Sequence, residues 1–172
     1  DNKKLAAIKI ILQIRSASNT TNFLLFTELV LTLTYLCIKY GNPPQASTIY
    51  AFYGMLMSGM TAEIDYGYKF GKLAINLLEK DDNQKFQAEI FFLYYAYIWC
   101  WKNPLNEQVI QEKLLYGLQQ GLNTGHNEYV GFLAQAYCAI KFLGGCQLEE
   151  VERDCEKYIH FVEKLNQEYS HK

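Results

Sequence analysis

The sequence predicts an all-α fold in which about seven to eight helices pack as antiparallel hairpins. Half of the 172 residues are hydrophobic and only three are Pro, which excludes a disordered segment. Residues that break helices gather at a few points and leave stretches of helical length between them. No stretch alternates polar and apolar residues with period two for long enough to predict a sheet.

The helix boundaries are predicted from residues that end or begin helices. The run Gly41-Asn42-Pro43-Pro44 ends one helix and begins the next, because Gly stops a helix, Asn caps one and Pro is tolerated in a first turn. Similar residues mark later breaks at 80–83, 103–104, 124–125 and 144–145. Connections this short predict antiparallel neighbours. The expected helices are 3–17, 21–40, 43–59, 63–80, 84–102, 105–124, 127–143 and 147–169.

The last expected helix is clearly amphipathic. Val151, Cys155, Ile159 and Val162 recur at i, i+4, i+8 and i+11 and form one apolar stripe. The acidic residues of 149–156 suit the first half of the helix, where its dipole favours negative charge. We interpret them as a solvated surface.

Charge, cysteine usage and hydropathy restrict the class of partner. The net charge of −2 provides no basic stripe, so we expect no nucleic-acid partner. Five Cys residues, an odd number without a C-x-x-C pair, favour reduced thiols in the cytoplasm. No secretory signal is seen at the start. The apolar stretch 23–38 is too short for a membrane span and is expected to form a buried helix. The triplet 19–21 is interpreted as a helix cap. The oligomeric state is not indicated.

Small residues repeat with the same spacing in two expected helices. In both 63–80 and 105–124 they occur at i, i+4 and i+7. Gly inside a helix costs about 1 kcal/mol relative to Ala, so a repeated pair indicates that a neighbouring backbone comes close. In the helix that precedes each of these two, a small residue lies beneath large aromatic residues. The predicted interlock comprises Gly54, Gly67, Gly71, Ala74, Ala96, Gly117 and Gly121.

These residues resemble a tetratricopeptide-type (TPR) repeat, with a small residue in the first helix and Gly67, Phe70 and Ala74 in the second. The resemblance implies a right-handed TPR-like α-solenoid. Two departures speak against a regular array: Gly54 and Ala96 are about 42 residues apart instead of roughly 34, and Pro is missing from the expected repeat end.

A closer resemblance covers nearly the whole chain. The run Lys39-Tyr40-Gly41-Asn42-Pro43-Pro44-Gln45-Ala46-Ser47, then Tyr53-Gly54, then 67–74, resembles the helical-repeat region of large cyanobacterial-type signalling proteins. There the region follows a Ser/Thr-kinase-like domain and a STAND/AAA ATPase domain, and it precedes GAF and histidine-kinase domains. The resemblance implies that 1–172 is a single TPR-like domain excised from a longer protein.

Motifs that would indicate catalysis are incomplete. The stretch 65–73 ends in Gly-Lys-Leu, but a phosphate loop requires Gly where Tyr66 stands and Ser or Thr where Leu73 stands. Cys155 and His160 are five residues apart and so point to different faces of a helix. His126 and His171 lie near expected helix ends. The apolar setting of the thiols does not favour a nucleophile. We therefore predict no enzyme activity, no cofactor and no metal.

The abundant aromatic residues suggest a binding function. In a TPR-like stack the first helices line a concave surface, and Tyr is enriched at interfaces. We expect a module that binds a protein segment or a flanking domain of the same polypeptide and relays signals within a multidomain kinase/ATPase. The alternative is a small-molecule sensor, favoured by a closed aromatic cavity larger than about 300 Å³. A second alternative, a helical enzyme, would need polar groups that converge on one site. The aromatic rings can also serve only as packing in the core and between repeats. The predicted concave residues are Thr48, Ala51, Met55, Leu93, Tyr97, Leu133 and Tyr137.

Overall fold

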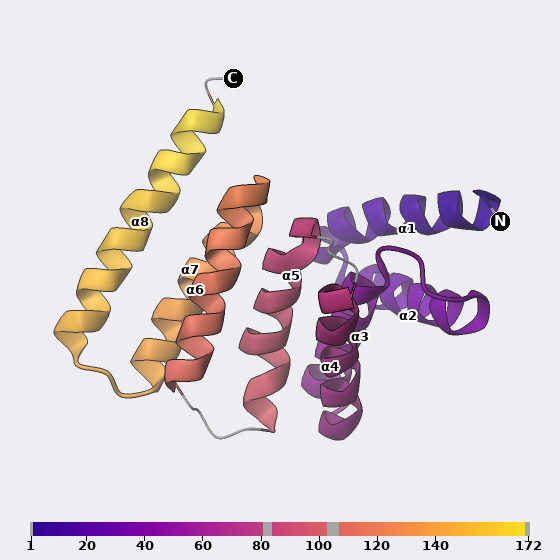
Figure 1. The fold of residues 1–172 in the computed structure, drawn as a ribbon, viewed down its shortest axis with the longest axis horizontal. Helices are drawn as coiled ribbons and strands as arrows, with labels where there is room; N and C mark the ends of the chain where they lie inside the picture. The colour runs from indigo at the N-terminus through magenta and orange to yellow at the C-terminus, as the bar shows by residue number, and fades with distance from the viewer. Residues whose placement is uncertain (1, 81–83, 103–106, 171–172) are drawn as a thin grey trace.

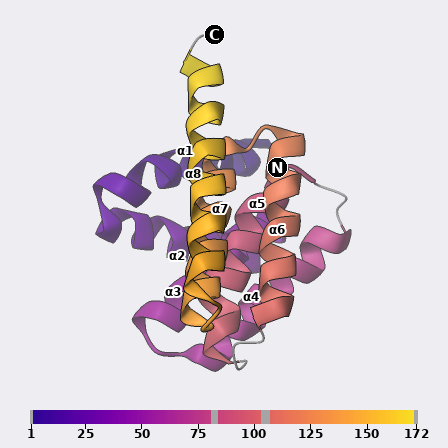
Figure 2. The same cartoon turned by 90° about the vertical axis from the view of Figure 1, so that its left-hand side faces the viewer.

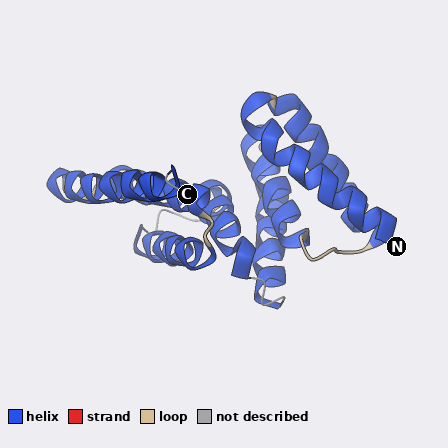
Figure 3. Cartoon of the chain, turned by 90° about the horizontal axis from the view of Figure 1, so that it is seen from above, coloured by secondary structure: helices blue, strands red, loops and turns tan. Residues whose placement is uncertain are grey.

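The computed structural model describes residues 2–80, 84–102 and 107–170, and within these ranges it contains helices and no strand (Figure 3). The all-α prediction is therefore confirmed. The helices are α1 (Asn2–Thr21), α2 (Phe23–Tyr40), α3 (Ala46–Met60), α4 (Ile64–Lys80), α5 (Gln87–Phe92), α6 (Glu107–Thr124), α7 (Asn127–Leu143) and α8 (Leu148–Ser170).

Most helix boundaries lie within a few residues of the predicted ones, but the first two needed correction. Helix α1 continues to Thr21, so the triplet 19–21 does not cap the following helix. Asn22 takes that role, and its side chain accepts a hydrogen bond from the Leu25 backbone N–H at 3.0 Å. Gly41 then ends α2 with φ +93°, in the region that favours glycine.

The segment 84–102, predicted as one helix, is instead a composite. A 3₁₀ turn, Gln84–Phe86, leads into α5; a π-helix, Leu93–Ile98, follows, and a 3₁₀ turn, Trp99–Trp101, ends the element. A π-helix places residues five apart on the same side, whereas an α-helix turns them roughly 140° from each other. Accordingly the rings of Phe92 and Tyr97 lie only 5.2 Å apart.

The helices form an array with one turned hairpin at its start. Helices α3 to α8 lie side by side in alternating directions, and α1 and α2 run across them (Figure 1). One buried cluster, with Phe26, Leu33 and Ile49 at its centre, joins the first helices to α5. A second, built around Ile98, Ile110 and Leu133, joins the segment 84–101 to α6, α7 and α8. The segment 84–101 thus connects two cores.

Helices α3 and α4 come into backbone contact at the predicted glycines. A Cβ on Gly54 would lie 2.8 Å from the Gly67 carbonyl oxygen and 3.0 Å from the Gly71 nitrogen. Gly71 also faces the π-helix, where a Cβ would lie 2.8 Å from the Tyr94 ring. Ala74 is fully buried on the same stripe. Only residues without a side chain permit this approach.

The second glycine pair packs against a different part of its neighbour than expected. A Cβ on Gly121 would meet Ala88 at 3.2 Å, and one on Gly117 would meet the Cβ of Phe91 at 2.9 Å. Both contacts come from α5. Ala96, the expected small partner, lies two turns further along, faces α7 and lines an open groove with it.

Helix α2 is buried on one side only, which differs from the expectation of a buried helix. Phe26, Val30 and Leu33 enter the core, whereas Leu24 and Ile38 are 81% and 67% exposed. The helix is long and apolar enough to cross a membrane by length and composition alone. At the other end of the array, α8 forms the outer edge and extends past its neighbours (Figure 2).

Candidate functional site

An apolar groove lies between the π-helix and α7. Its volume is about 270 Å³, and it is open to solvent. On the α7 side, Ala136 and Ala139 line the groove and leave room beside the larger rings. The groove is lined mainly by Phe92, Ala96, Tyr97, Phe132, Ala136 and Leu143.

Aromatic rings continue from this groove towards the start of α7. Phe92 and Phe132 are stacked, with ring centroids 5.4 Å apart and an interplanar angle of 20°. Tyr129 makes edge contacts with both rings, at 6.0 Å and 5.8 Å, and His126 lies 5.4 Å from Tyr129. We call these five residues, His126, Tyr129, Phe132, Phe92 and Tyr97, the aromatic row. Each such aromatic pair contributes about 0.5–1.5 kcal/mol beyond the area it buries, which stabilises this arrangement of rings.

The structure places the predicted concave residues mostly in the interior. Ala51, Leu93 and Leu133 belong to the buried cores, and Met55 packs against both. Tyr137 is buried, and its hydroxyl donates to the Asp154 carboxylate at 3.2 Å. Among the seven predicted residues, Tyr97 is 46% exposed in the groove and Thr48 lines a separate hollow.

The groove residues are therefore neighbours of the predicted ones. Phe92, Phe132 and Ala136 line it, each one residue before Leu93, Leu133 and Tyr137. Of the predicted residues, Tyr97 lines this groove, whereas Leu93, Leu133 and Tyr137 are buried one position away from residues that line it. No pattern in the sequence marks the position of the π-turn.

A buried polar cluster lies beyond the His126 end of the aromatic row. Arg15, from α1, contacts Glu89 at 3.3 Å, and Tyr129 donates its hydroxyl to the same carboxylate oxygen at 2.7 Å. The Arg15 guanidinium also lies 3.9 Å from the centre of the Phe52 ring. Burial and then the Glu89 charge raise the pKa of Tyr129, so its hydroxyl stays protonated and serves as a donor. Four elements meet at this cluster.

The contact between α7 and α8 combines an apolar groove with an ion pair. Cys138, Cys155 and Tyr158 line a groove of about 380 Å³ that is also open. Burial raises the pKa of Cys138 to about 12, so this thiol is a poor nucleophile at neutral pH. Lys141 donates to the Asp154 carboxylate at 2.7 Å, which lowers the pKa of Asp154.

The structure also locates the residues considered for metal and phosphate binding. Among the described residues, no group of three or more His, Cys, Asp or Glu side chains is close enough to hold a metal ion. His160 is exposed and lies 3.6 Å from Glu163, and His171 is outside the described residues. The stretch 65–73 lies within α4, with its backbone N–H groups in a helix and not in a phosphate-binding loop.

Comparison with known proteins does not define a family for this chain. No protein-family model, no curated protein sequence and no solved structure matches it. The function must therefore be inferred from the molecule itself.

Proposed function

We propose that this chain is a non-catalytic interaction module, and that the groove between the π-helix and α7 binds an extended protein segment. The observation that carries the proposal is the groove itself, in which solvent-accessible aromatic rings border a floor of small residues. Aromatic side chains beside such a hollow are the usual anchors of protein interfaces. An open groove suits a peptide better than an enclosed small molecule, so it favours the interaction module over the sensor.

The proposed architecture is a TPR-like stack of helical hairpins. The alternating directions of α3 to α8 support it, as does the backbone contact of α3 with α4 at Gly54 and Gly67 (Figure 1). In such a stack each hairpin contacts mainly its neighbours, so strain at one end can be passed to the other. The crosswise α1–α2 hairpin and the π-helix are departures from a regular repeat.

The module is proposed to act in the cytoplasm within a larger signalling polypeptide. Its role there is to relay the state of an ATPase region to an output kinase, as the resemblance of 39–47 and 67–74 implies. The exposed apolar stripe of α2, formed by Leu24, Leu31, Tyr35 and Ile38, supports contact with a neighbouring domain. A binding assay between this chain and the domains encoded beside it, with ATP and with ADP, tests the relay. Lack of association in both nucleotide states contradicts it.

Peptide binding in the groove is tested by selecting peptides from a displayed library and measuring their affinity by fluorescence anisotropy. Phe132→Ala removes a ring from the groove and is expected to weaken binding by at least about tenfold, as for an interface anchor. Phe142→Ala is the matched control, because Phe142 is exposed on the same helix and does not line the groove.

The control should leave the affinity within about twofold of the wild-type value. The proposed groove is refuted if no peptide is selected, or if the two substitutions weaken binding equally.

A further inference from the structure

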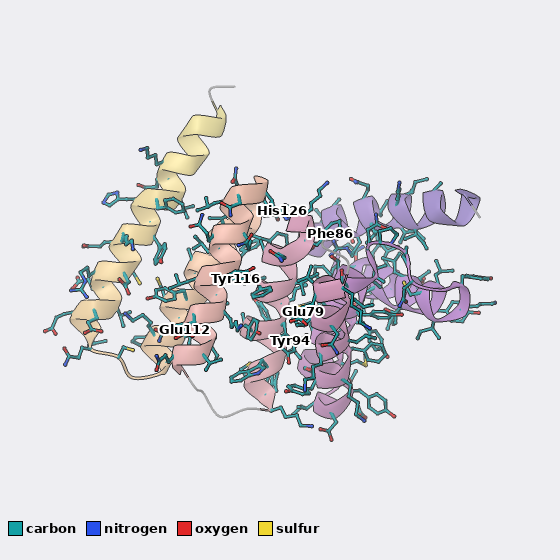
Figure 4. The ribbon with its side chains drawn as sticks, viewed as in Figure 1. Glu79, Phe86, Tyr94, Glu112, Tyr116 and His126 are labelled. Atoms are coloured by element: carbon teal, nitrogen blue, oxygen red, sulfur yellow. The ribbon has the colours of Figure 1, made fainter. Side chains whose placement is uncertain are left out.

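We propose that a second, polar cavity binds a small molecule that carries an anionic group, either a carboxylate or a phosphate. The cavity has a volume of about 370 Å³ and is half-open. It lies where α1 meets the first residues of α3, of the segment 84–101 and of α7. Figure 4 shows Phe86 and His126, two of its lining residues, near each other at the upper end of α5.

Four of the lining residues carry a buried polar atom that has no hydrogen-bond partner within the described part of the chain. These atoms are Arg15 Nε, Gln45 Oε1, Thr48 Oγ1 and His126 Nδ1. Arg15 and Thr48 are themselves more than nine-tenths buried. Buried polar groups in proteins nearly always have a partner, and to leave one without costs free energy. Four such atoms around a single cavity indicate that something polar completes the set.

The internal contacts of the site do not use these atoms. Arg15 reaches Glu89 through Nη2, and Glu89 accepts in addition from Tyr129. Gln45 and His126 occupy the capping positions before α3 and α7, but neither side chain makes a capping hydrogen bond. The cluster of Arg15, Glu89 and Tyr129 therefore holds the wall of the cavity in place and leaves donors and acceptors available beside it.

Charge favours an anion in this cavity. Arg15 and Glu89 pair with each other in the wall, and the exposed lining residues Lys9 and Lys85 then outnumber the one further carboxylate, that of Glu128. The N-termini of α3 and α7 also border the cavity, and the positive ends of their dipoles stabilise negative charge. Arg Nε can donate to a carboxylate or to a phosphate with the same geometry, so the two sources share one chemistry.

The size of the cavity distinguishes a ligand from single waters. One water occupies roughly 30 Å³ of liquid, whereas binding sites for small molecules begin at about 300 Å³. This site is also separate from the proposed peptide groove, which lies at the other end of the aromatic row. The binding test of one site can therefore fail while the binding test of the other succeeds.

The test is a titration of the isotope-labelled chain followed by two-dimensional ¹H–¹⁵N NMR. The probes are inorganic phosphate, adenosine monophosphate and L-glutamate, so that phosphate and carboxylate sources are separated. Saturable shifts are expected for amides of 45–48, 85–89 and 126–129, but not for those of 136–143 in the groove. Saturation by at least one probe supports the proposal, and the responding probe identifies the anion.

Variants then locate the contact. Thr48→Val removes the unpartnered hydroxyl and is expected to weaken binding roughly fivefold, as for one neutral hydrogen bond. Lys9→Gln with Lys85→Gln removes two exposed charges without a change in the interior, and should weaken binding about tenfold and reduce its dependence on salt. Lys113→Gln, on the exposed surface of α6, is the control for charge removal.

Two results overturn the proposal. One is that none of the three probes shifts the cavity amides, which would mean that water alone satisfies the buried atoms. The other is that Lys113→Gln weakens binding as much as the Lys9 and Lys85 double variant, which would show that the probes respond only to net charge.

Discussion

Gly54→Ala tests whether helix contact through bare backbone holds the first part of the array together. The added Cβ would lie 2.8 Å from the Gly67 carbonyl oxygen and 3.0 Å from the Gly71 nitrogen. Both are backbone atoms of α4, so neither can move aside as a flexible side chain would. Helices α3 and α4 must separate to accept the methyl group.

Two opposing terms set the magnitude. Overpacking of a close-packed interior costs about 1–3 kcal/mol, and rigid backbone neighbours place this site near the upper end. Ala is a better helix former than Gly by about 1 kcal/mol, which offsets part of the cost. The net loss expected is about 1–2 kcal/mol. For a chain of this length that corresponds to a decrease in Tm of roughly 3–6 °C.

Gly59→Ala is the internal control, because Gly59 belongs to the same helix and a Cβ there would meet nothing within 4 Å. Only the propensity term remains, and since Gly59 is next to the last residue of α3, the gain is limited to about 0.5 kcal/mol. Thermal and urea unfolding followed by circular dichroism at 222 nm measure both variants. If Gly54→Ala is as stable as the wild type, the contact between α3 and α4 is not what the glycines provide.

Three further changes probe the rest of the molecule. Glu89→Ala leaves Arg15 buried without its charge partner and should lower the free energy of unfolding by about 3 kcal/mol in urea titrations. The control, Glu112→Ala on the exposed face of α6, should change the free energy of unfolding by less than about 0.5 kcal/mol. Equal effects would show that the buried pair has no special role. Lys141 lowers the pKa of Asp154 below its ordinary 3.8, so the pair stabilises the fold above that pH and loses its effect as the pH falls through the lower, folded pKa. Asp154→Asn should therefore abolish this part of the acid sensitivity of α8, as measured by hydrogen exchange at several pH values. An unchanged pH profile of exchange would contradict this expectation. Burial raises the pKa of Cys37 from 9.0 to about 11, so at pH 8 its thiolate fraction is roughly 100-fold below that of a free thiol. Mass spectrometry after brief alkylation should therefore find Cys37 unmodified in the native chain and modified in urea.

Sequence reasoning was most successful where the determining interactions are local. The breaks at Gly41 and at 144–145 are where helices end, because Gly and Pro act on the backbone within a residue or two of their own position. The stripe of Gly67, Gly71 and Ala74 also predicted a close helix contact, since a costly residue repeated at helical spacing requires a compensating one. The Gly117 and Gly121 pair makes close contacts as expected, although with Ala88 and Phe91 in place of Ala96.

The candidate sites depended on information that the sequence pattern does not carry. Leu93 and Phe92 are both large and apolar, and only the packing of the neighbouring helices decides that the first enters the core and the second faces the groove. A helix with apolar residues on several sides gives no local signal for which side the neighbours leave open. The hydrophobic pattern therefore indicated these helices and Tyr97, but not the other residues that line the groove.

The sequence by itself determined that this protein is helical, where most of its helices end and which glycines let them touch, because these properties depend on backbone conformation and on spacing along one helix. Only the tertiary structure decided that Arg15, Glu89 and Tyr129 form one cluster, and that Phe92 and Phe132 stack beside an open groove. The physical reason is that such contacts join residues 40 or more positions apart, and that their geometry is set by how whole helices pack.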